Sequence, residues 1–128
     1  YQTLKQVWFS GMHTDVGGGY KEHELSDIPF VWLFKQAELC GLKIYKKDRI
    51  EITPKANGVM HDSMKGWWQS IVYKEKIRSW PSGRKDKPII HQSVIDRAGK
   101  LKDYTPWILD IDHEVEAVES IDRNDPKV

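Results

Sequence analysis

A histidine and a run of glycines lie close together near the start of the chain. His13 belongs to the segment Ser10 to Tyr20, which reads SGMHTDVGGGY. An imidazole, with an ordinary pKa of about 6.5, suits general acid and base catalysis near neutral pH. Gly17-Gly18-Gly19 can adopt positive φ or let a substrate or a second loop approach closely, because glycine has no Cβ. The segment is a candidate catalytic loop. The simpler alternative is a polar turn that Asp15 caps, in which His13 has no chemical role.

A second candidate site is distributed along the chain. His13, the pair His61-Asp62 and a distant Asp96 or Asp110 follow the chain order in which HD-type metal phosphohydrolases place their ligands. Imidazole and carboxylate together suit divalent transition metals. However, adjacent residues on a helix do not share a face, and Asp62 could equally cap a helix.

Two further clusters are better explained structurally. Ser93, with Asp96 three residues later, resembles a capping box at the start of a helix, and His91 would precede that cap. The segment 110–113 lacks the glycine and the downstream glutamate of a calcium-binding loop.

The elements on either side must position the candidate catalytic loop. Gln6 to Ser10 is rich in β-branched and aromatic residues and predicts a short buried strand. Ser26 to Cys40 predicts a helix, because Ser26 can cap it and its apolar residues recur every three or four positions. Gly41 suits the position just past the end of that helix. We expect this helix to be the most deeply buried element and to pack on the strand.

The later patterns are weaker. They predict a strand or helical turn over 42–52, a helix over 59–77, a turn over 80–84, a short element from Ile89, and a helix over 93–98 that stops at Gly99. The acidic tail over 110–128 is expected to pack only loosely. The tryptophans could form a platform for sugars or bases, but interior packing explains them with fewer assumptions.

Composition excludes several classes of protein. A chain of 128 residues corresponds to one domain, and 20 Lys and Arg against 19 Asp and Glu give a formal charge of +1. The interleaved charges provide no positive field for a phosphate backbone, so we expect no nucleic-acid partner. The longest strongly apolar run is Ile28 to Phe34. A helix that spans a bilayer needs about 20 residues, so we expect no transmembrane segment. The single Cys40 is compatible with a reducing compartment.

The segment Val7 to Tyr20, VWFSGMHTDVGGGY, resembles a signature of the DUF2235 family, α/β-hydrolase-like proteins that include type VI secretion phospholipase effectors. The likeness continues at 25–28, Trp32, 36–37, 61–63, 90–94, Arg97 and 104–106. The resemblance implies an α/β fold: the C-terminal part of an α/β-hydrolase-like fold, mostly helical with one or a few short strands. Residues 1–128 would then be a single domain, the C-terminal fragment of a DUF2235-type hydrolase domain.

The resemblance also implies a serine hydrolase of ester or lipid substrates, with a triad in the order Ser, Asp, His and no metal or organic cofactor. By the match, His13 is the triad base, which takes the proton from the serine hydroxyl and returns it to the leaving group. Asp15 and Gly17, Gly18 and Gly19 then shape the loop. The sequence contains no Gly-x-Ser-x-Gly nucleophile elbow, so we expect the chain to be inactive alone. The resemblance is compatible with a bacterial or fungal cytoplasm or with a secreted effector.

Two other functions stay open. The first is a non-catalytic protein-interaction module, which binds a partner or associates with a second copy through the exposed edge of the strand Val7 to Ser10. The second is an HD-type metal phosphohydrolase.

Overall fold

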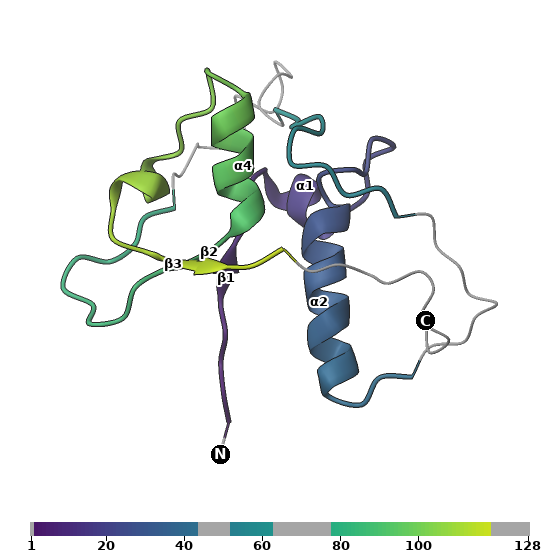
Figure 1. Ribbon diagram of the computed structural model, residues 1–128, viewed down its shortest axis with the longest axis horizontal. Coiled ribbons are helices and arrows are strands. Elements are labelled where there is room, and N and C mark those ends of the chain that lie inside the picture. The colour runs from purple at the N-terminus through teal and green to yellow at the C-terminus, as the bar shows by residue number, and fades with distance from the viewer. Residues whose placement is uncertain (1, 44–51, 63–77, 119–128) are drawn as a thin grey trace, which may run out of the picture.

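A small parallel sheet with helices beside it forms the centre of the computed structural model, which describes residues 2–43, 52–62 and 78–118 (Figure 1). The strands β1 (Val7–Trp8), β2 (Ile89–His91) and β3 (Glu114–Glu116) lie in the order β1-β2-β3, and both pairs are parallel. Val7 pairs with Ile89, and Ile90 pairs with Val115. The α/β class expected from the sequence is therefore confirmed.

Helix α2 (Asp27–Leu39) is the long helix that the sequence predicts, and Gly41 follows it with a φ of 92°. The expected depth of burial is wrong, because Leu33 and Leu39 are 62% and 82% exposed. Apolar residues are spread around the helix, so only a strip that includes Ile28 and Val31 can face the interior. The Ser26 hydroxyl donates to the carbonyl of His23 and does not cap the helix.

Helix α4 (Gln92–Lys100) begins one residue earlier than predicted and includes Gly99. The expected capping box is absent, because Asp96 accepts a hydrogen bond from the Gln92 side chain. His91 is the cap instead: its Nδ1 accepts from the backbone N–H of Ser93 at 3.2 Å. An imidazole at the end of a strand thus accepts from the second helical residue, one of the N–H groups that have no partner within the helix.

The core lies where β2, α4 and the 3₁₀ helix η1 (Trp107–Asp110) meet. Ile90, Val94 and Ile108 are buried there, and Trp8 and Trp107 pack against them with their rings 5.8 Å apart. The packing role expected for Trp107 is confirmed. Trp67 and Trp68 lie outside the described residues.

The segment expected to form a loose tail contains β3, and Glu116 of that strand accepts hydrogen bonds from Trp32 Nε1 and Lys5 Nζ. The predicted turn around Ser82-Gly83 is present. Most of the elements predicted over 42–52 and 59–77 lie outside the described residues, and 59–62 is not helical. Within the described parts of the chain, no helix combines the length and apolar character that crossing a membrane requires.

Candidate active site

The His13 segment leaves the carboxyl end of β1 and enters helix α1 (His13–Gly17) directly. His13 is the first residue of this helix, and its side chain is exposed. Gly11 forms the bend before the helix with a φ of 112°, and a Cβ there would lie 2.5 Å from the Cβ of Asp15. Glycine is therefore required at this position, both for conformation and for space.

The glycine run lies at the end of α1. Gly17 is its last residue, while Gly18 and Gly19 have φ values of 83° and 123°. A Cβ at Gly17 or Gly18 would meet no heavy atom within 4 Å, so this side of the loop is open. Other chemical groups can approach the backbone there.

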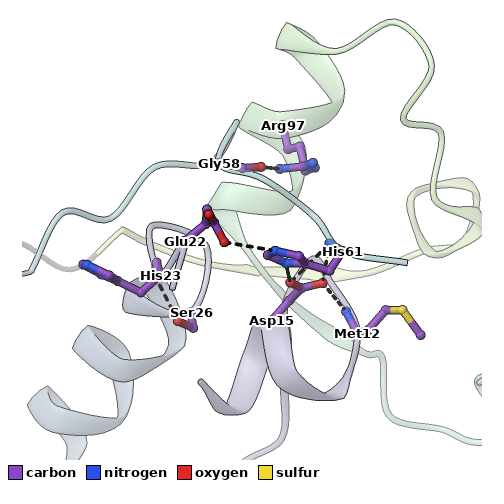
Figure 2. Close-up of polar contacts among 8 residues, drawn as sticks. All are labelled: Met12, Asp15, Glu22, His23, Ser26, Gly58, His61 and Arg97. Carbon is purple, nitrogen blue, oxygen red and sulfur yellow. Dashed lines mark hydrogen bonds and ion pairs between the residues drawn. The ribbon is translucent and has the colours of Figure 1, made fainter. Parts of the chain in front are cut away.

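Asp15 is the buried centre of the loop (Figure 2), with 2% of its surface exposed. Its carboxylate accepts hydrogen bonds from the backbone N–H groups of Met12 and His61, both at 3.1 Å. It also pairs with His61 Nδ1 at 2.7 Å. Asp15 thus fixes the start of α1 and joins it to a segment more than forty residues away in the chain.

His61 is held on three sides. Besides Asp15, its ring stacks on Tyr20 with centroids 3.7 Å apart, and its Nε2 lies 3.5 Å from Glu22 Oε2. The carboxylate of Asp15 orients the ring through Nδ1 and leaves Nε2 on the side of the more exposed Glu22. Among residues 2–43, 52–62 and 78–118, no group of three or more His, Cys, Asp or Glu side chains is arranged to hold a metal ion.

The segment 52–62, which carries His61, is held by charged side chains from two further elements. The Thr53 N–H donates to Asp27 at 2.7 Å, and Arg97 Nη1 donates to the carbonyl of Ala56 at 2.8 Å. Arg97 Nη1 also donates to the carbonyl of Gly58 at 2.7 Å (Figure 2). Arg97 is buried, and its Cζ lies 5.2 Å from the centre of the Tyr104 ring. These contacts fix the segment between α2 and α4.

A pocket of about 270 Å³ lies beside this segment. Its walls come from Ile28 and Val31 of α2, from residues 54–57, and from His91 and Ser93 at the junction of β2 and α4. In sheets of parallel strands, ligands bind outside the carboxyl ends of the strands, which is where this pocket lies. It is therefore a second candidate for a functional site.

His91 is the titratable group deepest in the pocket wall, with 2% of its surface exposed. Its ring stacks on Phe9 with centroids 4.8 Å apart. Burial lowers the pKa of His91 below its ordinary value, and the nearby carboxylates of Glu116 and Asp96 oppose this change without overcoming it. The ring is therefore neutral at neutral pH.

The structure divides the residues singled out from the sequence between two places. His13, Asp15 and Gly17 to Gly19 share one loop, and His61 joins them, while His91, Ser93 and Asp96 line the pocket. Sequence reasoning missed the pairing of Asp15 with His61, which no local pattern signals. It also missed His91 as a cap, for which the available signal was a histidine that follows two β-branched residues at the end of a strand.

Comparison with known proteins gives one similarity. The model of the family described as "T6SS, Phospholipase effector Tle1-like, catalytic domain" matches residues 1–36. Neither a curated protein nor a solved structure matches the chain. The matched residues hold β1, the His13 loop, α1 and most of α2. This part of the chain is thus similar to the catalytic domain of a type VI secretion phospholipase effector.

Proposed function

We propose that this chain is the C-terminal portion of a serine ester hydrolase of the DUF2235 type, with an α/β-hydrolase-like fold and lipid esters as substrates. One observation carries the proposal: the segment similar to a phospholipase catalytic domain is the segment that brings His13 to the carboxyl end of a parallel strand. Catalytic side chains of α/β enzymes characteristically occupy such positions.

His13 is the proposed base. Its exposure at the start of α1 leaves the imidazole accessible to a serine hydroxyl, and the open side of Gly17 and Gly18 leaves room for another loop to approach. Asp15 is already engaged by Met12 and His61, so its proposed role is to shape the loop and not to orient His13. A further carboxylate has to act as the triad acid.

The chain alone is proposed to be inactive. None of its serines lies in a Gly-x-Ser-x-Gly sequence, so a nucleophile and its oxyanion hole have to come from other residues. Without a nucleophile, only the residual rate enhancement of binding and oxyanion stabilisation is available.

The test compares the 128-residue chain with the product of the complete reading frame that encodes it, using p-nitrophenyl esters and phospholipid vesicles. We expect hydrolysis only by the complete product, and a loss of about 10³-fold or more in kcat on His13→Ala. His113→Ala is the matched control, because His113 lies before β3, outside the segment similar to phospholipases. Full activity of the His13→Ala variant, or robust esterase activity of the 128-residue chain, would refute the proposal.

A second candidate function is supported by the surface. Leu33 and Leu39 of α2 are exposed, and among the described strands β1 is paired on one side only. An unpaired strand edge is a template for pairing with another chain. The candidate is a non-catalytic module that self-associates through the outer edge of β1. Size-exclusion chromatography with light scattering tests it, and a clean monomer at high protein concentration would contradict it.

A further inference from the structure

The pocket between α2 and α4 exposes more apolar than polar surface, and His91 is the most deeply buried of the polar side chains in its lining. We propose that it binds a short aliphatic chain whose terminal carboxyl or ester oxygen accepts a hydrogen bond from His91 Nε2. The choice of an acyl ligand rests on the proposed function, whereas the site itself rests on the geometry of the pocket and of His91.

The hydrogen bonds of His91 fix which nitrogen carries the proton. Nδ1 accepts from the Ser93 backbone N–H at 3.2 Å and lies 2.8 Å from the Ser93 hydroxyl, so it is the unprotonated nitrogen. In the neutral ring the proton is then on Nε2. No described residue accepts a hydrogen bond from Nε2, and this atom is not fully buried, because among the described side-chain nitrogens and oxygens only Arg97 Nε is both fully buried and unpaired. The Nε2–H group therefore remains accessible in the pocket wall, where a ligand oxygen would accept from it.

The apolar walls define the rest of the ligand. Ile28 and Val31 are one turn apart on α2 and are 7% and 4% exposed. The other apolar side chains in the lining belong to segments outside the helices and strands, and they are Pro54, Ala56 and Val118. A volume of about 270 Å³ has room for a short or medium aliphatic chain. The ligand is therefore a short or medium acyl chain.

Charges at the pocket do not select strongly between an acid and an ester. Lys55 pairs with Glu24 at 3.2 Å, and Asp96 and Lys100 lie one turn apart on α4 with opposite charges. Because these charges balance, recognition depends on the apolar walls and on the Nε2–H group. A free carboxylate and a neutral ester share that chemistry, and separate titrations with each distinguish them.

The test titrates hexanoate and methyl hexanoate separately into the ¹⁵N-labelled 128-residue chain at pH 7.5, monitored by backbone amide and histidine-ring NMR. We expect saturable shifts at residues 54–57 and at His91 Nε2, with a dissociation constant on the order of 1 mM for at least one of the two probes. Acetate and methyl acetate, which lack the chain, and hexyltrimethylammonium, which lacks the acceptor, should bind at least fivefold more weakly.

Two substitutions separate the pocket from nonspecific surface binding. Val118→Arg places a charge at the pocket and should weaken binding at least fivefold, whereas Val115→Arg, on an exposed position of β3 outside the pocket, should not. Amide spectra of both variants establish that each is folded. Absence of saturable shifts with both probes, an unchanged His91 Nε2 signal, or equal weakening by the two variants would overturn the site.

The outcome is separable from that of the proposed function. If the acyl probes bind but the complete reading frame has no esterase activity, the site stands and the hydrolase proposal fails. If His13-dependent hydrolysis is found but neither probe binds, the hydrolase proposal stands and this site fails.

Discussion

Asp15 is the residue on which the glycine loop depends most directly. Its carboxylate is buried and accepts from Met12, from the backbone of His61 and from the His61 ring. Removing the charge of a buried, fully engaged carboxylate weakens several hydrogen bonds at once. Asp15 thus helps to fix the position of His13, because it accepts from the backbone N–H of Met12 at the start of α1.

We predict that Asp15→Asn lowers the free energy of unfolding by about 1–3 kcal/mol, because an amide cannot accept from all of these donors. Urea denaturation measures the change. Asp103→Asn, at an exposed position after α4, is the matched control and should change stability by less than about 0.5 kcal/mol. Equal effects of the two substitutions would show that the carboxylate contacts contribute nothing specific.

His91 gives the molecule a pH dependence of definite sign. Burial lowers its pKa in the folded chain below the ordinary value of 6.5. As pH falls, the unfolded chain therefore binds a proton at His91 before the folded chain does. The contribution of His91 to stability is present above about pH 6.5 and is lost as pH falls toward the folded-state pKa.

We predict that the free energy of unfolding of the wild-type chain falls more steeply below pH 6.5 than that of His91→Asn. Asparagine retains an acceptor for the start of α4 but does not titrate. Denaturation at several pH values measures the difference between the two slopes. Parallel pH profiles would contradict the assignment of a neutral, buried imidazole.

At the scale of elements, what the sequence predicted correctly depends on local physics. The presence of β1, the extent of α2 and the positive φ of Gly41 follow from propensity, periodicity and the steric freedom of glycine, although β1 is shorter and less buried than the predicted strand Gln6 to Ser10. The pairing of Asp15 with His61 and the third strand β3 were not predictable, because both depend on which distant segments the fold brings together. His91 was misjudged because the sequence pattern placed the start of the helix at Ser93, whereas the cap is His91, two residues earlier.

Strand β3 is tied to α2 and to the N-terminal segment by one carboxylate. Glu116 accepts from Trp32 Nε1 at 2.9 Å and from Lys5 Nζ. Burial raises the pKa of Glu116, but the hydrogen bonds from Lys5 and Trp32 lower it by more. The pKa of Glu116 is therefore below its ordinary value. Its contribution to stability is therefore present above the unfolded-state pKa and is lost as pH falls through the folded-state value.

We predict that Glu116→Gln lowers the free energy of unfolding by about 1 kcal/mol at pH 7, and that the difference from wild type shrinks below about pH 4.5. Glu114→Gln, an exposed position on the same strand, is the matched control. Chemical denaturation at pH 7 and at acidic pH gives both values. A difference that persists unchanged in acid would mean that the amide disrupts packing and not an ionic contact.

At the scale of the whole molecule, the segment 52–62 connects the two candidate sites. His61 near one end pairs with Asp15 behind the His13 loop, and residues 54–57 form a wall of the acyl pocket. The attachment between them is the buried Arg97, which holds the carbonyls of Ala56 and Gly58. An arginine that bonds backbone carbonyls fixes the path of a loop that has no regular structure of its own.

Substituting Arg97 should release this segment before it affects the sheet. We predict that Arg97→Met, which keeps most of the apolar volume but removes both hydrogen bonds, raises amide hydrogen exchange over residues 52–62 by about tenfold or more, corresponding to about 1.4 kcal/mol of local opening. Lys100→Met on the same helix is the matched control, because Lys100 is exposed and should leave exchange unchanged. If exchange rises equally in β2, Arg97 supports global stability instead. If it rises nowhere, the segment is held by its other contacts, such as those with Asp15 and Asp27, and the two candidate sites are not coupled through α4.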